Sequence, residues 1–243
     1  MAVSGKVAIV AALEREVRPL TKHWRAVERQ HDGRKFTFFE NGNVVLVCGG
    51  IGPDAARRAT EAVIELYQPA EVVSAGFAGA VDSALKVGAV FVPARVVDSQ
   101  DGSSAETYTG KGVIVSCATM AGPEQKTKLA NAFGAQAVDM EAAAVARGTQ
   151  ARGLRFLAVK AISDENDFSL PRMHRFVSPE GKFRTAAFVG SVAAQPWIWL
   201  EVFRLARNAS RASRALCRRL EQYRGSTLDS NSSDLQPAVS GEG

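Results

Sequence analysis

Apolar, β-branched runs alternate with amphipathic helical patterns along most of this chain, and this alternation restricts the fold more than any other feature. The runs are KVAIVAA, NVVLVCGG, EVVSAGFAG, AVFVPARVVDS, GVIVSC and RFLAVKAIS. Between the second and third lies PDAARRATEAVIELYQP, whose apolar residues recur at helical spacing. Continuous apolar strands separated by helices favour a mostly parallel sheet that is covered on both faces. We therefore predict an α/β protein with a mostly parallel, mixed central sheet flanked by helices.

Length and composition fit a single domain with a loose end. The 243 residues, 46% of them hydrophobic, suffice to bury one core. Past Pro196 the segment WIWLEVFRLARNASRASRALCRRLEQYR has one apolar side and an opposite side rich in arginine, which predicts one amphipathic helix. Beyond Arg224 the chain has too little apolar content to offset the entropy of ordering. We predict one domain over residues 1–224, ending in this basic helix, and a disordered tail over 225–243.

Cysteine and histidine patterns argue against a disulfide framework or a zinc site. Cys48, Cys117 and Cys217 are widely spaced without a Cys-x-x-Cys pair, and the three histidines show no ligand spacing. We therefore expect no metal and a protein of the reducing cytoplasm. No apolar run approaches the ~18 residues that a membrane-spanning helix needs, so any membrane contact is expected to be peripheral.

Acidic side chains follow several of the apolar runs, at the edge of the sheet where α/β proteins bind ligands. They are Glu14, Glu16, Asp139, Glu141, Asp164 and Asp167. A cleft with several carboxylates suits either a divalent metal or a cationic transition state that exchanges protons. The second fits better here, because a carboxylate can accept hydrogen bonds from two vicinal sugar hydroxyls and favour an oxocarbenium-like centre.

In sequence and order, six segments resemble the purine nucleoside phosphorylase and nucleosidase superfamily. They are VAIVAALEREV, CGGIGPDAA, SAGFAGAV, LKVGAVFVP, VDMEAAAVA and KAISDENDF, and the resemblance spans Lys6 to Phe168. The similarity is greatest to methylthioadenosine/S-adenosylhomocysteine nucleosidases. It implies a nucleoside phosphorylase-like three-layer α/β/α fold and release of adenine from a 5′-substituted adenosine by cleavage of its N-glycosidic bond. It also implies that no cofactor is used, and a homodimer whose partner closes part of each pocket.

The same resemblance implies roles for particular residues. Glu16 matches the glutamate that activates the attacking water, and Asp164, after Ser163, matches the general acid at the purine N7. Glu141 matches the glutamate that binds the ribose hydroxyls, with Met140 near the sugar and base. Glu16 and Asp164 are thus the expected catalytic residues, and the other three are expected to bind substrate.

Two positions depart from the nucleosidase pattern. In Gly76-Phe77-Ala78-Gly79-Ala80, Phe77 stands where these enzymes commonly have serine, so an aromatic side chain replaces a polar contact. In SCATMAG, Met120 stands where they place a phenylalanine against adenine. Phe77, Ala78 and Met120 are expected to line the pocket, and the identity of the 5′ substituent stays open. Asp139 is expected only to support its neighbours.

The attacking nucleophile is expected to be water, with phosphate as the alternative. The strand EVVSAGFAG has no basic residue before its glycine loop, where many phosphorylases keep an arginine. Arg15 and Arg18 could bind an anion, but Glu14 and Glu16 beside them would repel phosphate. Lys160 can either orient Glu16 or contact an anion.

The C-terminal part, from LPRMHRFVSPEGKF through QPWIWLEVFRLARNASRASRAL, resembles hopanoid-associated phosphorylases, bacterial relatives that release adenine from an adenosylated triterpenoid. On this alternative, the basic helix with Trp197 and Trp199 holds the protein near a lipid surface or covers an apolar 5′ substituent. A second alternative is a catalytically inactive relative that binds a nucleoside or a lipid. The arginine face is most simply a solvated helix face, and no nucleic-acid partner is expected.

Overall fold

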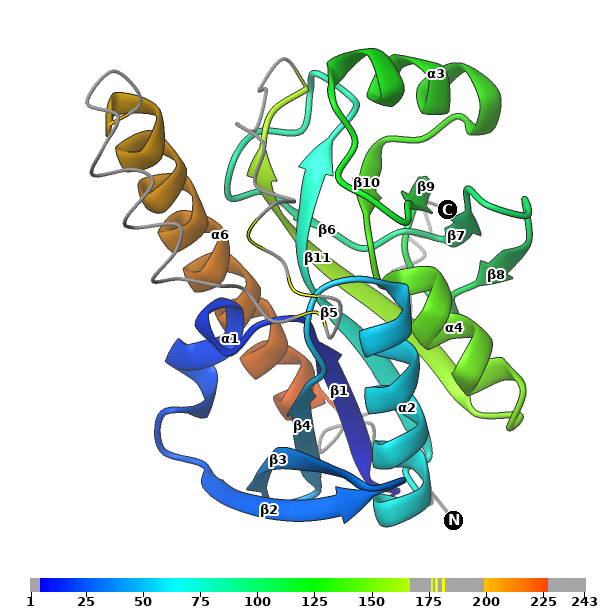
Figure 1. The fold of residues 1–243 in the computed structure, drawn as a ribbon, viewed down its shortest axis with the longest axis vertical. Coiled ribbons are helices and arrows are strands. Elements are labelled where there is room, and N and C mark those ends of the chain that lie inside the picture. Colours follow the sequence, from blue (N-terminus) through cyan, green and yellow to red (C-terminus); the bar gives the residue numbers. More distant parts are fainter. Residues whose placement is uncertain (1–4, 167–175, 177, 179–180, 182–198, 227–243) are drawn as a thin grey trace, which may run out of the picture.

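One large mixed β-sheet forms the centre of the molecule in the computed structural model, which describes residues 5–166, 176, 178, 181 and 199–226 (Figure 1). The strands are β1 (Val7–Ala11), β2 (Arg25–His31), β3 (Arg34–Asn41), β4 (Val44–Cys48), β5 (Glu71–Ala80), β6 (Val90–Phe91), β7 (Arg95–Asp98), β8 (Ser104–Glu106), β9 (Val113–Ser116), β10 (Ala137–Asp139) and β11 (Arg155–Asp164). The helices are α1 (Glu14–Thr21), α2 (Pro53–Tyr67), α3 (Pro123–Phe133), α4 (Ala142–Gln150) and α6 (Trp199–Ser226).

The sheet combines parallel pairs with antiparallel ones. The strand order is β2-β3-β4-β1-β5-β10-β9-β7-β8, and β11 pairs with β5 and with β6 outside this path. Strand β1 runs parallel to β4 and β5, and β11 runs parallel to β5. The expected mixed sheet is confirmed, with its antiparallel share in the β2–β3–β4 meander and in the β5–β10, β6–β11 and β7–β8 pairs.

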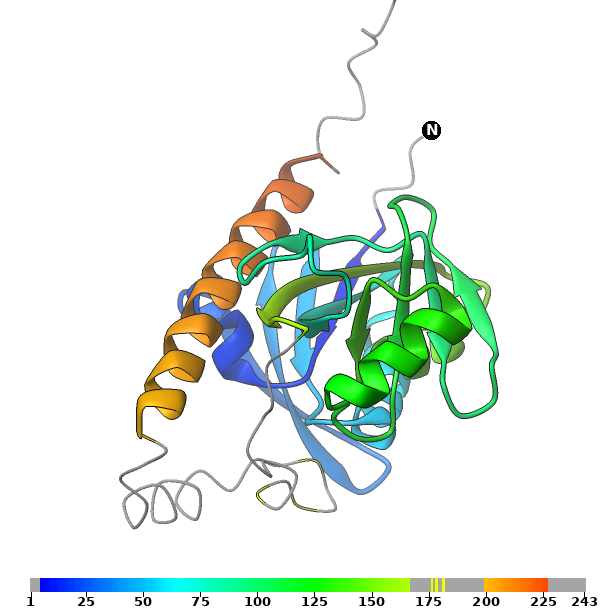
Figure 2. The ribbon, with the colours of Figure 1, turned by 90° about the horizontal axis from the view of Figure 1, so that it is seen from above.

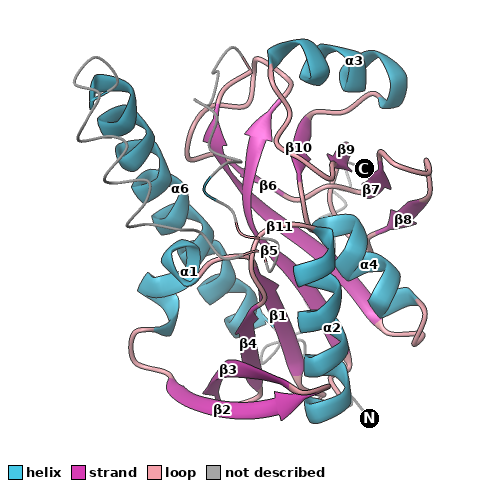
Figure 3. Ribbon diagram, viewed as in Figure 1, coloured by secondary structure: helices cyan, strands magenta, loops and turns pink. Residues whose placement is uncertain are grey.

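Helices cover both faces of the sheet, as expected. Helices α2 and α4 lie on one face, and α1 and α6 lie on the other (Figures 1 and 2). Figure 3 shows the same arrangement with helices and strands in separate colours. The first pair buries small side chains such as Ala59 and Val145 against β1, β4 and β5, whereas the second pair buries Val17, Leu216 and Leu220. The fold is thus a sheet between two helical layers.

Four short or polar strands, β2, β3, β8 and β10, are not evident from the hydrophobic pattern. The β2–β3 hairpin is largely exposed and polar, so its residues give no buried run. The predicted run AVFVPARVVDS splits into β6 and β7, because Pro93 between them has no N–H to donate to a ladder. Tertiary pairing rather than local sequence therefore decides these parts of the sheet.

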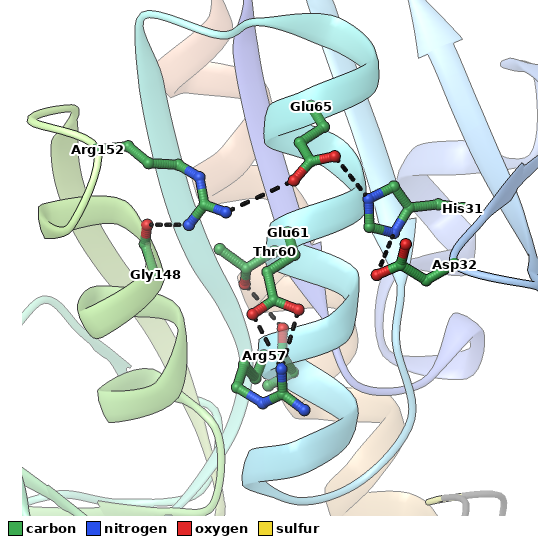
Figure 4. A network of polar contacts seen from close by, with 9 residues as sticks. His31, Asp32, Arg57, Thr60, Glu61, Glu65, Gly148 and Arg152 are labelled. Atoms are coloured by element: carbon green, nitrogen blue, oxygen red, sulfur yellow. Dashed lines mark hydrogen bonds and ion pairs between the residues drawn. The ribbon is translucent and has the colours of Figure 1, made fainter.

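A surface network ties the hairpin to α2 and α4 (Figure 4). The ring of His31, at the end of β2, lies 3.0 Å from a carboxylate oxygen of Glu65 in α2. Arg152 lies 3.8 Å from the other oxygen of Glu65 and donates to the carbonyl of Gly148 in α4. Exposed pairs of this kind contribute little each, typically below about 1 kcal/mol, so the network orients the hairpin more than it stabilises the fold.

Helix α6 is amphipathic and basic, as predicted. Its buried side carries Ala212, Leu216 and Leu220, while Arg204, Arg207, Arg211, Arg214 and Arg218 are exposed. The predicted start of this helix, before Trp199, lies outside the described residues. Of the predicted tail, the first two residues extend α6 to Ser226, and the others lie outside the described residues. No described helix is long and apolar enough to cross a membrane.

Removal of the Leu216 side chain should test how firmly α6 is held. Leu216 is fully buried against α1 and the sheet, so Leu216→Ala should lower the free energy of unfolding by about 2–5 kcal/mol in chemical denaturation. The control Arg214→Ala changes an exposed residue of the same helix and should stay within about 0.5 kcal/mol. Equal, small effects of the two changes would contradict the described packing.

Candidate active site

A cavity of about 970 Å³ lies at the carboxyl ends of the central strands, between α1, α6 and the loops that follow β5, β9 and β11. Every predicted site residue lines it: Glu16, Phe77, Ala78, Met120, Met140, Glu141, Ser163 and Asp164. The structure therefore brings together residues that are up to 148 positions apart in sequence, while their chemical roles stay predictions. Among the other predicted acids, Glu14 is exposed and Asp167 lies outside the described residues.

Glu16 is buried and incompletely paired. It lies in the first turn of α1, with 6% of its surface exposed, and its Oε2 has no hydrogen-bond partner among the described residues. Burial, reinforced by repulsion from Glu141, raises the pKa of Glu16 to about 8, against the attraction of Lys160. Gly76 makes room for this side chain, since a Cβ there would stand 3.1 Å from Oε2. An unpaired buried carboxylate oxygen is costly, which suggests that Oε2 is kept for a ligand.

Glu141 is fixed at a corner between a strand and a helix. It is the residue that caps α4, and its Oε1 accepts a hydrogen bond from the Gly52 backbone N–H at 2.8 Å. Gly52 has φ +96°, in a region that glycine adopts readily, so the turn before α2 can aim this N–H at the carboxylate. Burial, together with repulsion from Asp139, raises the pKa of Glu141 to about 7. Glu141 thus lies immediately before the first residue of α4, Ala142.

Asp139 and Lys160 form a buried ion pair beneath the cavity. Lys160 Nζ lies 2.7 Å from Asp139 Oδ2 and donates to Ser74 Oγ at 3.0 Å, and both side chains are almost fully buried. Asp139 also accepts hydrogen bonds from the Ser116 hydroxyl and from the Ala142 backbone N–H at the start of α4. Lys160 does not line the cavity, and its contacts are to Asp139 and Ser74, so it acts on Glu16 through its charge.

Asp164 lines the cavity and is held by two donors. Its Oδ2 accepts a hydrogen bond from Lys126 Nζ at 2.7 Å, and its Oδ1 accepts one from the Ser163 hydroxyl at 2.8 Å. The register between β11 and β5 shifts between Ile162 and Asp164, and such a bulge redirects side chains at the end of a strand. Gly79 of β5 lies directly against the pair, because a Cβ there would stand 2.7 Å from Asp164 Oδ2.

Lys126 is the site residue that sequence reasoning missed. It lies in α3, only 2% exposed, and it lines the cavity. The available signal was its place three residues before Leu129, on the buried face of an otherwise polar helix. Its partner Asp164 lies 38 residues further on, so local spacing could not pair them.

Helix α6 provides an apolar wall of the cavity. Val202, Leu205, Ala206 and Ala209 line the cavity along the first half of this helix. Its second half supports α1, where the Ser213 hydroxyl and the Cys217 thiol donate to the backbone carbonyls of Arg15 and Glu16, at 3.4 Å and 3.7 Å. One helix therefore both shapes the cavity and supports the turn that carries Glu16.

Basic residues of α1 and the segment after it complete the lining. Arg15, Arg18 and Lys22 contribute to the cavity and are exposed. No group of three or more His, Cys, Asp or Glu side chains that could hold a metal ion occurs among the described residues. The lining thus combines buried acids, Glu16 of α1 among them, with apolar side chains of α6 and basic side chains of α1 and the segment after it.

A mixed sheet between helical layers, with a cavity at the ends of its strands, defines an α/β protein that binds its ligand at the carboxyl edge of the sheet. The chain belongs to the Phosphorylase superfamily, whose family model matches residues 6–117 and 107–189. Within it, the chain is similar to 5′-methylthioadenosine/S-adenosylhomocysteine nucleosidases. That of Buchnera aphidicola is 28% identical over 200 residues, covering 67% of this chain and 86% of the relative, and that of Actinobacillus succinogenes is 29% identical over 201 residues with the same coverage.

Solved structures agree on the fold. The Helicobacter pylori enzyme of this type matches with a TM-score of 0.68 and 19% identity over 93% of this chain and 98% of that one. The futalosine hydrolase of the same organism matches with a TM-score of 0.65 and 19% identity over 91% and 100%. A nucleosidase from Colwellia psychrerythraea, solved with adenine, matches with a TM-score of 0.61 and 25% identity over 87% and 96%. The expected superfamily and fold are therefore confirmed.

The supporting role of Asp139 can be tested through stability. Asp139→Asn should leave the Lys160 ammonium buried without its counter-charge and lower the free energy of unfolding by roughly 3 kcal/mol. The control Asp32→Asn changes an exposed turn residue at positive φ, which asparagine also tolerates, and should stay within about 0.5 kcal/mol. Urea titration of the three proteins measures both changes, and an Asp139→Asn variant as stable as the control would refute the supporting role.

Proposed function

We propose that this protein cleaves the N-glycosidic bond of a 5′-substituted adenosine by hydrolysis and releases adenine. The observation that carries the proposal is the convergence of Glu16, Glu141 and Asp164 on one cavity large enough for a nucleoside, with an unpaired buried oxygen on Glu16 among the described residues. Relatives that are 28–29% identical carry the nucleosidase name, which supports the same reaction class.

The ribose binds at Glu141. Its Oε1 is already held by Gly52, so the carboxylate is oriented before substrate arrives and can accept hydrogen bonds from the two vicinal hydroxyls. Its negative charge lies close to the anomeric carbon and favours the positive character that develops there as the bond breaks. Met140, beside it, lines the sugar end of the cavity.

The base leaves toward Asp164, and water enters from Glu16. As the bond between C1′ and N9 breaks, its electron pair stays with the purine, and Asp164 delivers a proton to N7. Water adds to C1′, and its proton passes to Glu16. The Oε2 atom of Glu16 has no hydrogen-bond partner among the described residues and can accept this proton. Phe77, Ala78 and Met120 line the cavity and pack around the nucleoside, while Ser163 fixes the Asp164 carboxylate.

A bulky apolar 5′ substituent is a second candidate, supported by the wall that α6 provides. Val202, Leu205, Ala206 and Ala209 extend the lining beyond what the acids need, and about 970 Å³ is at the upper end for a small-molecule site. This candidate corresponds to a phosphorylase acting on an adenosylated triterpenoid, with Arg15 or Arg18 near the incoming phosphate. The homodimer, the cytoplasmic location and contact of the basic helix with a membrane surface stay predictions.

A substrate panel with one variant tests the function. The wild-type protein should release free adenine from methylthioadenosine or S-adenosylhomocysteine in the absence of phosphate. Chromatography measures the adenine released. Asp164→Asn should lower turnover by ~10²–10⁴-fold, because it removes protonation of the leaving base. The control Asp54→Asn alters an exposed acid in α2 and should keep wild-type turnover.

The same panel separates the alternatives. A requirement for phosphate, or turnover only when the methylthio group is replaced by a long alkyl chain, would favour the second candidate. No adenine from any substrate in either condition would refute both and leave the inactive relative. Wild-type turnover in Asp164→Asn would refute the role of this residue.

The raised pKa values predict an alkaline rise in activity. Glu16 must be ionised to take a proton from water, and its pKa of about 8 leaves it largely protonated at neutral pH. Therefore kcat/KM, which reports the free enzyme, should rise with pH through about 7 to 8 as Glu141 and then Glu16 ionise. Steady-state kinetics across this range measures the rise, and a maximum near pH 5 with a decline above it would contradict the role of Glu16 as base.

A further inference from the structure

Lys126 carries a buried charge that packing of α3 does not by itself explain. It is 2% exposed, and its ammonium contacts the Asp164 carboxylate at 2.7 Å and the Glu165 backbone carbonyl at 3.1 Å. A buried ion pair is often no more stabilising than apolar residues of the same volume, because both charges lose their hydration. Leu129 provides the apolar contact on the buried face of α3, whereas the Lys126 ammonium is directed to the Asp164 carboxylate.

The pair also lies where the base is proposed to leave. Lys126 and Asp164 both line the cavity, and Gly79 leaves the backbone of β5 against them, since a Cβ there would stand 3.0 Å from Lys126 Nζ. Both Asp164 oxygens accept hydrogen bonds in this arrangement, one from Ser163 and one from Lys126. The acidic proton of the cluster is then the one on the Lys126 ammonium.

We propose that Lys126 is the source of the proton for the departing base, with Asp164 passing that proton from the Lys126 ammonium to N7 of the purine. This inference rests on the proposed function and adds to it a second residue of the protonating group. The short contact between Nζ and Oδ2 provides the path for the transfer, and Ser163 keeps the Asp164 carboxylate in place during it.

The proton transfers accompany cleavage of the glycosidic bond. The bond between C1′ and N9 breaks and its electron pair stays on the purine, while N7 gains a proton from Asp164 and Asp164 takes one from Lys126. Lys126 becomes a neutral amine and Asp164 returns to a carboxylate. Water adds to C1′ and gives its proton to Glu16. After the products leave, Glu16 loses this proton to solvent and Lys126 regains one, which restores the starting charges.

Two substitutions separate proton supply from the mere presence of a positive charge. Lys126→Met removes the ammonium at similar length, whereas Lys126→Arg keeps a cation and hydrogen-bond donors but retains its protons at any ordinary pH. Both should lose ~10²–10⁴-fold in kcat on an adenine nucleoside with little change in KM. The control Lys128→Met alters an exposed lysine of the same helix, which forms an ion pair with Glu124, and should keep wild-type turnover.

A substrate that needs no proton provides the decisive comparison. The N7-methylated form of the same nucleoside leaves as a neutral base without protonation, so both Lys126 variants should lose less than tenfold on it, relative to wild type. Circular dichroism and binding of free adenine establish that each variant is folded with an intact cavity. The wild-type protein alone provides a further test. Its turnover of the ordinary substrate should fall at high pH as the protonated group is lost, whereas its turnover of the N7-methyl form should not.

The outcomes are distinct. Full turnover of Lys126→Arg, or equal losses on the two substrates by a folded variant, would overturn the inference and leave Lys126 a positioning residue. If the variants do not fold, equal pH dependence of the wild-type protein on the two substrates would overturn it. Absence of purine release by the wild-type protein would instead refute the proposed function itself.

Discussion

The buried pair between Lys160 and Asp139 is the interaction on which the arrangement of the cavity depends. It joins β11 to β10, and through the Ala142 backbone N–H it also fixes the start of α4 and therefore the position of Glu141. Lys160 also offsets part of the cost of burying Glu16 and Glu141, since its charge opposes the rise in both pKa values. Without this cation, Glu16, Asp139 and Glu141 would share one poorly hydrated space with nothing to balance their repulsion.

The topology of the sheet explains how distant residues meet. Strand β5 pairs with β11 along most of its length, with β1 along its first part and with β10 at its end. The segments after β1, β4 and β11 and the end of β10 therefore open at one edge, which brings Glu16, Gly52, Asp164 and Glu141 to the same cavity. Glycines at positions 76 and 79 of β5 let the carboxylates approach the backbone. The sheet is thus the scaffold, and chemistry is confined to the residues that follow its strands.

Sequence alone predicted the strands with continuous apolar runs and the acids that follow them, because burial on both faces and position after a strand leave a local signal. Glu16, Glu141 and Asp164 were found in this way, together with a family resemblance. The β2–β3 hairpin was missed, since its exposed residues carry no run, and Pro93 divided what looked like one strand. Lys126 was missed for a different reason: a lysine on a polar helix is ordinary until a partner from another element buries it. Pairing between separate segments is information that spacing does not contain.

Helix α6 divides its tasks along its length. The first half forms the wall beside the ligand, with Val202 and Leu205, and the second half is anchored to α1 and the sheet by Leu216 and Leu220. Residues of the wall contribute little to the anchor, so their size can change while the turn that carries Glu16 stays where it is. This separation gives the fold a route to new specificity. Exchange of a few side chains in one exposed stretch could enlarge or shorten the space for a substituent, and the acids that break the glycosidic bond would be undisturbed.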